Sequence, residues 1–171
     1  MPAEHTRPLR HLVLRPGQPP ESTIYPGDDD PDTVHFAAFE DGQLLGVASL
    51  YREPRAGANA RAPAWRLRGM ATAPHARGRG VGHALLAACR THVAGEGGGE
   101  LWCNARTPAA GFYAAAGFEL ASDEFDVPGI GPHVVMRVHV RARRPPHPPT
   151  GDAGHGPDHV RRHQFDEAEG R

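Results

Sequence analysis

Residues 70–86 read MATAPHARGRGVGHALL, and this stretch decides the interpretation of the fold. A strand-like segment runs into a loop with glycines at positions 78, 80 and 82. The loop opens directly into a helix whose apolar residues recur at spacings of three and four. The first turn of a helix has unpaired N–H groups and the positive end of the helix dipole. Because glycines leave room for a phosphate to reach those amides, the loop predicts a site for a phosphorylated ligand.

The basic residues of the chain help to decide which known type of phosphate loop this one can be. Arg77 and Arg79 add guanidinium donors. The dinucleotide-binding pattern G-x-G-x-x-G is excluded, because its third glycine position falls on Leu85. All 19 basic residues are arginine, which excludes a Walker loop and every mechanism that needs a lysine. A flexible glycine-rich turn without a ligand is the structural alternative.

Strand and helix patterns alternate on both sides of this loop. Strands are expected at residues 34–40, 43–51, 64–72, 101–104, 118–125 and 133–140. Three helices are expected: from a cap at Thr6 to about Pro16, at 80–94, and from Pro108 to Ala116. In the first helix, Leu9, Leu12 and Val13 are expected on one face. Asp41-Gly42 predicts a hairpin turn, and Gly117 a helix C-cap. This order predicts an α/β fold, a mixed sheet with helices on both sides.

Composition predicts one domain at residues 1–141 and a disordered tail rich in Pro, His and Arg at 142–171. The tail holds four of the 12 histidines at irregular spacing, and no metal site is expected. Twenty acidic and 19 basic residues argue against a dedicated nucleic-acid or membrane partner. No apolar run suits a signal peptide or membrane span, so a cytoplasmic protein is expected, with Cys89 and Cys103 reduced and partly buried.

Two motifs in order resemble the GNAT superfamily of N-acyltransferases. Arg77-x-x-Gly80-x-Gly82, preceded by a strand and Pro74, resembles the acetyl-CoA pyrophosphate loop of that family. About 30 residues later, Asn104 at a strand end and the segment from Tyr113 to Gly117-Phe118 are similar to the strand, helix and Tyr-x-x-x-Gly-Phe ending of the same family. The resemblance covers roughly residues 34–140 and implies a twisted mixed sheet of six to seven strands.

The resemblance also implies a function and a set of roles. It implies transfer of an acetyl group from acetyl-CoA to a primary amine, on a small molecule or an exposed amino group, by direct attack in a ternary complex. Two neighbouring parallel strands would splay apart around the pantetheine arm, which Asn104 contacts, while Tyr113 protonates the departing thiolate. The backbone of Met70, Ala71 and Thr72 would bind the pantetheine and thioester carbonyl. The pyrophosphate would contact Arg77, Gly78, Arg79, Gly80, Val81 and Gly82. Tyr113 packing into the core is the alternative for that residue.

A general base has no fixed motif in the family. An amine with a pKa of about 10.4 is neutral in only about one molecule in 2,500 at pH 7, so some group must accept its proton. His133 is the first choice, because it begins the last strand and histidine has a suitable intrinsic pKa. A structural histidine is the alternative. The other candidates are Glu40, Glu53, Asp123, Glu124 and His35.

Several alternatives stay open from the sequence. A catalytically silent acyl-CoA-binding module would keep the loop without a productive Tyr113, and a nucleotide- or RNA-binding regulator would use Arg66, Arg68, Arg77 and Arg79. Little chain precedes the first helix, so the usual first strand of the family is short, absent or replaced. The acceptor amine and the oligomeric state, including a homodimer, are therefore undetermined. The acidic turn Asp28 to Asp30 is read as solvated surface, with attraction of a cationic amine as the alternative.

Overall fold

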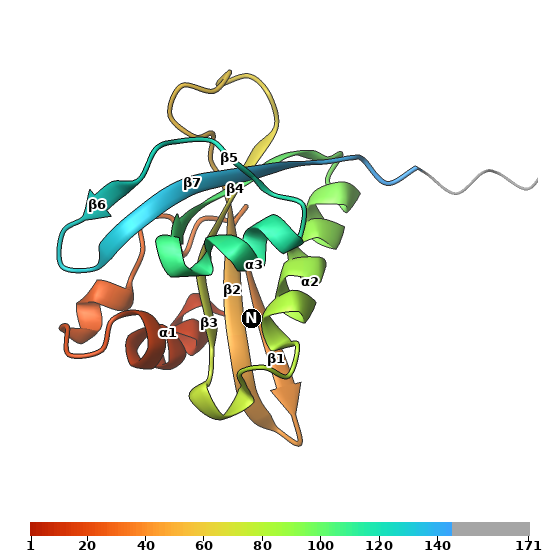
Figure 1. Ribbon diagram of the computed structural model, residues 1–171. Helices are drawn as coiled ribbons and strands as arrows, with labels where there is room; N and C mark the ends of the chain where they lie inside the picture. The colour runs from red at the N-terminus through yellow and green to blue at the C-terminus, as the bar shows by residue number, and fades with distance from the viewer. Residues whose placement is uncertain (145–171) are drawn as a thin grey trace, which may run out of the picture.

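A seven-stranded mixed sheet forms the centre of the computed structural model, which describes residues 1–144 (Figure 1). The strands are β1 (Val34–Glu40), β2 (Gln43–Arg52), β3 (Ala64–Thr72), β4 (Gly99–Arg106), β5 (Glu119–Leu120), β6 (Phe125–Val127) and β7 (Gly131–Val140). Their order is β1-β2-β3-β4-β7-β5, with β6 also pairing β7. Only β3 and β4 run parallel; the other pairs are antiparallel. The predicted α/β class and strand number are confirmed.

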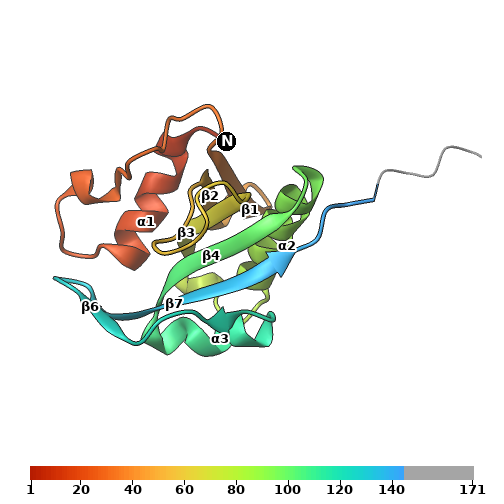
Figure 2. The same cartoon turned by 90° about the horizontal axis from the view of Figure 1, so that it is seen from above.

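Helices cover both faces of the sheet. They are α1 (Arg7–Leu14), α2 (Val81–Gly95) and α3 (Ala110–Ala115), with 3-10 turns at Ala3–Thr6, Pro20–Thr23, Pro74–Ala76 and Thr107–Ala109. Figure 2 shows α1 and α3 on opposite sides of the β4–β7 pair. Within residues 1–144 no strand precedes α1, in line with the expected departure from the family layout. No helix in the described part of the chain has both the length and the apolar character to cross a bilayer.

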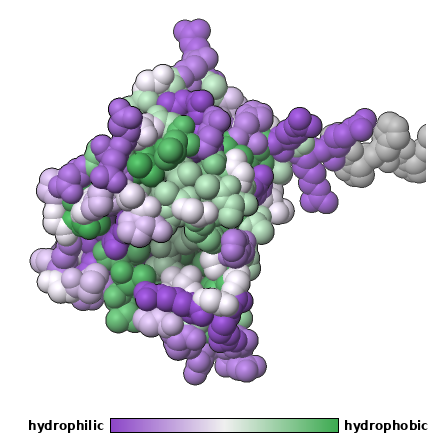
Figure 3. Space-filling model, viewed as in Figure 1, coloured by the Kyte–Doolittle hydropathy of each residue, from purple (hydrophilic) through white to green (hydrophobic). Residues whose placement is uncertain are grey.

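The core forms where α2 packs on the sheet. A Cβ at Gly46 of β2 would lie 2.7 Å from Val81 and 2.9 Å from Leu85, so glycine lets the helix approach closely. Trp65 and Leu101, from the parallel strand pair, are also fully buried. On the face drawn in Figure 1, apolar residues gather over the middle of the molecule and hydrophilic residues lie around its rim (Figure 3).

Two local predictions are confirmed in backbone detail. Asp41 and Gly42 both have positive φ, 47° and 78°, as a two-residue type I′ hairpin requires. Gly117 has φ 89° and ends α3 in a Schellman motif, in which the Phe118 amide donates to Tyr113 and the Gly117 amide to Ala114. Both turns fix the direction of the following strand.

Three other predictions are wrong. The strand expected at residues 118–125 is interrupted after β5, and β6 begins only at Phe125. At the break, the Ser122 hydroxyl accepts a hydrogen bond from the Val135 amide at 2.8 Å and takes the place of a backbone acceptor in the ladder. In α1, Leu9 is buried as expected, but Leu12 is 59% exposed and Arg10 is fully buried. Thr6 lies at the N-cap position, yet its hydroxyl donates back to the Ala3 carbonyl at 2.6 Å instead of capping the helix.

Candidate functional site: a cavity in the splayed sheet

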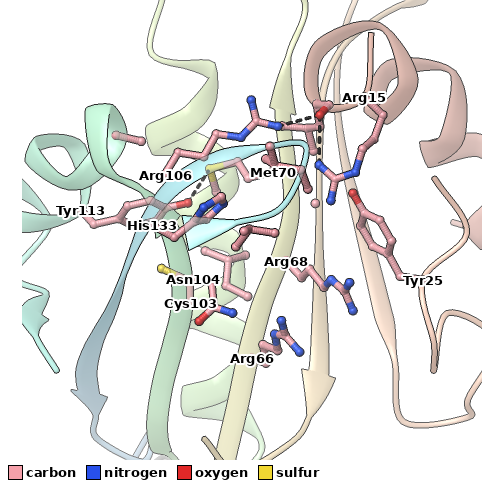
Figure 4. A pocket seen from close by; sticks show the side chains of 17 residues that line it. Arg15, Tyr25, Arg66, Arg68, Met70, Cys103, Asn104, Arg106, Tyr113 and His133 are labelled. Atoms are coloured by element: carbon pink, nitrogen blue, oxygen red, sulfur yellow. Dashed lines mark hydrogen bonds between the residues drawn. The ribbon is translucent and has the colours of Figure 1, made fainter. Parts of the chain in front are cut away.

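The parallel strands β3 and β4 pair over only three residues each. Their register ends at Arg66 and Trp102, although β3 continues to Thr72 and β4 to Arg106. The two strands therefore separate toward their carboxyl ends. A cavity of ≈ 240 Å³ lies at this gap, and four of the predicted site residues line it, Met70, Asn104, Tyr113 and His133 (Figure 4).

A β-bulge on β3 borders the cavity. Opposite Gly69 and Met70 there is a single residue of β2, because Val47 pairs with Ala71 and Ser49 pairs with Arg68. Gly69 has φ 66°, and a Cβ there would lie 2.9 Å from the guanidinium of Arg10. The bulge disrupts the ladder beside Met70, which makes the backbone of this segment available for a ligand.

Tyr113 reaches the cavity from α3. The side chain is 8% exposed and packs edge-on against Phe112 and Phe118. Its hydroxyl lies 3.9 Å from the thioether sulfur of Met70, a weak acceptor. Burial raises the pKa of Tyr113 well above its usual value, so the phenol keeps its proton throughout the neutral range. The structure thus places a buried O–H donor with a weak partner at the cavity.

His133 enters the same cavity from the start of β7. It is 7% exposed, and its ring stacks on Phe125. Nδ1 lies 2.8 Å from the carbonyl of Gly131, which accepts a hydrogen bond when Nδ1 carries the proton. In that tautomer, Nε2 is a proton acceptor. Figure 4 shows the ring of His133 beside the Tyr113 hydroxyl and Met70.

The beginning of α2 has the open donor arrangement expected of an anion site. None of the backbone amides of residues 78–83 donates a hydrogen bond to an acceptor in residues 1–144, and no side chain caps the helix. Gly78 and Gly80 have φ 72° and 80°, and no protein atom lies within 4 Å of the Cβ position at either glycine. A diphosphate group therefore fits this cradle sterically and in its hydrogen bonding. The side chain of Val81 is buried in the core, so only its backbone amide is available to a ligand.

The two loop arginines differ in their partners. Arg77 is exposed and forms no ion pair within residues 1–144, whereas Arg79 donates to Glu40 at 2.7 Å. Glu40 is therefore engaged beside the loop and does not line the cavity. Of the remaining candidate bases, Glu53 pairs with Arg66 at 3.0 Å and Glu124 accepts from Thr107 at 2.9 Å.

A buried polar network lies under α1, where the sequence suggested a solvated turn. Asp28 is 4% exposed, and its carboxylate accepts hydrogen bonds from Arg10 at 2.8 and 3.1 Å. Arg10 also donates to Ser49 and Tyr51 of β2. His35 lies 2.6 Å from the Ser49 hydroxyl and belongs to this network. Solvated surface is thus wrong for Asp28, although it describes Asp29 and Asp30, which are exposed.

Four arginines line the cavity, and none was predicted there; Arg66 pairs with Glu53, and three others remain. Arg15 is the C-cap residue that follows α1, Arg68 lies on β3 and Arg106 ends β4 (Figure 4). An isolated glycine inside a strand pattern, here Gly69, signals a bulge and could have drawn attention to this part of β3. No sequence signal links the three arginines, because they are distant along the chain.

Neither metal nor thiol chemistry is indicated at the cavity. Among residues 1–144, no three His, Cys, Asp or Glu side chains gather as a metal site would require. Burial raises the pKa of both Cys89 and Cys103 to about 12, so both thiols keep their protons. The four histidines of the predicted tail lie outside the described residues, as does the tail from residue 145 onward.

Comparison with known proteins agrees with the fold. The model of the acetyltransferase (GNAT) family matches residues 5–118. An uncharacterized N-acetyltransferase of Bacillus subtilis, YitI, is 37% identical over 141 residues, which cover 82% of this chain and 94% of that protein.

Solved structures show the same fold. An acyl-CoA N-acyltransferase from Pseudomonas aeruginosa has a TM-score of 0.59 at 24% identity, over 80% of this chain and 87% of that one. An aminoglycoside 6'-N-acetyltransferase complexed with coenzyme A has a TM-score of 0.62 at 14% identity, over 84% and 93%. From the family match and the 37% identical relative, we conclude that this chain belongs to the GNAT family and is an acetyltransferase.

Proposed function

We propose that this acetyltransferase moves an acetyl group from acetyl-CoA to a primary amine by direct attack within a ternary complex. The observation that carries the proposal is the cavity at the β3–β4 gap, whose lining includes α1 residue Leu14 and α3 residue Tyr113. The two helices lie on opposite sides of the sheet. A donor and an acceptor that approach from opposite sides can therefore meet there without a covalent enzyme intermediate.

The cofactor side of the site is assigned to β3 and the start of α2. The backbone of Met70, Ala71 and Thr72 would bind the pantetheine arm and donate to the thioester carbonyl as negative charge develops on its oxygen. Asn104 would contact the arm from β4. The amides from Gly78 to Gly82, with Arg77 and Arg79, would bind the diphosphate. Acetyl-CoA supplies the activated acetyl group when bound.

Proton movement is assigned to two side chains of the cavity. Tyr113 would protonate the leaving thiolate, which is a stronger acceptor for its hydroxyl than the thioether of Met70. His133 would accept a proton from the amine through Nε2, because Nδ1 is engaged with Gly131. Of the candidate bases, only His133 lines the cavity. Its role as a base is therefore favoured over those of the five carboxylates and histidines considered with it.

Initial rates test this proposal. Purified protein is incubated with acetyl-CoA and a panel of primary amines, while free thiol and acetylated amine are both measured. We expect thiol release that depends on the amine, one acetylated product for each thiol, and rate patterns in which both substrates bind before either product leaves. Either an acetylated enzyme formed without amine, or CoA binding with no thiol release for any amine, would contradict the proposal.

A further inference from the structure

The cavity is strongly cationic. Its lining contains four arginines and His133, but no aspartate or glutamate. One of the four, Arg66, is neutralised by Glu53 at 3.0 Å. The other three, Arg15, Arg68 and Arg106, have no carboxylate within 4.0 Å among residues 1–144. Three uncompensated cations therefore share one cavity.

Two of these cations converge on a single acceptor. Arg15 and Arg106 both donate to the carbonyl of Leu14, at 3.0 and 2.6 Å (Figure 4). Leu14 is the last residue of α1, and helix C-terminal carbonyls carry partial negative charge. One carbonyl dipole does not neutralise two full charges. Burial lowers the pKa of Arg106, and the charge of Arg15 lowers it further.

Arg68 completes the group. Its guanidinium lies 4.2 Å from the centre of the Tyr25 ring, and Arg15 lies 5.8 Å from the same ring. The Arg68 side chain makes no hydrogen bond within the described residues, so its donors are free. Burial, and then the neighbouring Arg66, lower the pKa of Arg68. The free donors of this half-buried guanidinium can therefore bind water or an anionic ligand, and a charged acceptor forms the stronger hydrogen bond.

Arg10 and Arg68 both contact the ring of Tyr25, but only Arg10 has a carboxylate partner. Arg10 lies 4.2 Å from the centre of Tyr25, as Arg68 does, but Arg10 is bound by the carboxylate of Asp28. Among residues 1–144 the chain thus provides a counter-ion for Arg10, which stabilises the fold, and none for Arg15, Arg68 and Arg106 of the cavity. The missing counter-ion at the cavity is consistent with a ligand that brings its own negative charge.

We propose that Arg15, Arg68 and Arg106 bind an anionic group of the acceptor, so that the acceptor is a small amine that also carries a carboxylate or a phosphate. This inference rests on the proposed acetyl transfer. The amine would lie toward Tyr113 and His133, and the anionic group would lie toward the end of α1. Such an acceptor differs from the purely cationic amine that an acidic turn would attract, because it carries an added anionic group, and Asp28 of that turn is already engaged by Arg10.

Matched acceptors test the proposal. Amino acids are compared with their carboxamides, and 2-aminoethyl phosphate with ethanolamine, in the wild type and in Arg68→Gln and Arg106→Gln. We expect the wild type to prefer the anionic member of at least one pair in kcat/KM. Each substitution should lower that preference about tenfold or more, as expected for loss of a charge-assisted hydrogen bond. Arg61→Gln, in the exposed 53–63 loop, is the control and should keep the preference.

Binding measurements separate this inference from the proposed function. The affinities of N-acetyl amino acids and of their N-acetyl carboxamides are measured with CoA present, together with the affinity of CoA alone. Preferential binding of the acids without any acetyl transfer would support the anion subsite and contradict the proposed reaction. Preference for neutral or cationic acceptors, or substitutions that weaken CoA binding and leave the acceptor preference intact, would overturn the inference.

Discussion

Arg10 and Arg77 represent two opposite uses of arginine in this chain. Arg10 is fully buried and donates to Thr23, Asp28, Ser49 and Tyr51, whereas Arg77 is exposed beside backbone amides that have no acceptor. The first region is closed, because its polar atoms pair mostly with one another, although the Nε of Arg10 is buried without a hydrogen-bond partner. The second is open. Donors that are paired within the chain therefore stabilise the fold, whereas donors without an acceptor are available to a ligand.

The closed region attaches the irregular N-terminal segment to the sheet. Arg10 lies on α1, Thr23 on a 3-10 turn, Asp28 in the following loop, and Ser49 and Tyr51 on β2. Because Leu14 and Tyr25, on this same segment, line the cavity, the network also positions one wall of the site. Its contribution to function is indirect, through the placement of that wall.

The largest expected effect is on stability, at Arg10. Arg10→Met should lower the free energy of unfolding by about 3 to 5 kcal/mol, because it leaves Asp28 buried without its counter-ion. Urea denaturation measures the loss. Arg61→Met, in an exposed loop, is the matched control and should change stability by less than about 0.5 kcal/mol. A loss below about 1 kcal/mol for Arg10→Met would mean that the network does not hold the segment.

Tyr113 combines features of the two regions. It is buried like Arg10, but its hydroxyl has only a weak hydrogen-bond partner. Tyr113→Phe should reduce kcat about 100-fold, the lower range for general acid catalysis, with little change in stability. Tyr51→Phe is the matched control, since the Tyr51 hydroxyl lies 2.5 Å from the Asp28 carboxylate. That variant should lose about 1 to 2 kcal/mol of stability, measured by urea denaturation. Equal losses of kcat and CoA affinity in Tyr113→Phe would indicate a packing role instead.

The open region is tested by a pair of glycines. Gly80 and Gly57 have φ 80° and 77°, and neither has a protein atom within 4 Å of its Cβ position. Valine at either position should therefore destabilise the fold by a similar amount, about 1 to 2 kcal/mol. Only Gly80→Val should weaken CoA binding, by about 30-fold or more, measured calorimetrically, because its side chain occupies the proposed diphosphate position. Unchanged CoA affinity would refute the loop assignment.

A smaller loss is expected at Arg77. Arg77→Ala should weaken CoA binding about tenfold, because it removes a charge-assisted hydrogen bond, and should leave the unfolding free energy unchanged. Fluorescence or calorimetric titration measures the affinity, with Arg61→Ala as the control. A stability loss of more than about 1 kcal/mol would place Arg77 with Arg10 among the structural arginines.

The pH dependence of stability gives the smallest effect. Although burial alone would raise the pKa of Asp28, hydrogen bonds from Arg10 and Tyr51 outweigh it and keep the folded-state pKa below its usual value of 3.8. The carboxylate therefore stabilises the fold fully above about pH 4, and this contribution is lost as the pH falls below that value. The stability difference between the wild type and Asp28→Asn should shrink on acidification. A constant difference between pH 6 and pH 3 would contradict this assignment.

Structural features set by a few neighbouring residues could be predicted from the sequence. The glycine loop with open backbone amides before α2 is one contiguous segment, Asp41-Gly42 determines its own turn, and Gly117 ends its own helix. These features depend on backbone requirements of a few neighbouring residues.

Features that depend on distant residues were missed. The sequence predicts no role for Arg10, because nothing near it in the chain shows that Asp28 lies within hydrogen-bond distance. Arg15, Arg68 and Arg106 come from a helix end and two strands, and only the separation of β3 and β4 brings them to one cavity. The break at Ser122 likewise depends on Val135, thirteen residues away.

A crystal structure of the protein with bound CoA would be the most direct test of the proposed cofactor site. We expect the diphosphate to contact the backbone amides of residues 78–83 and the Arg77 side chain, with the thiol inside the cavity near the Tyr113 hydroxyl. A diphosphate bound elsewhere on the surface, or a thiol outside the gap between β3 and β4, would contradict it.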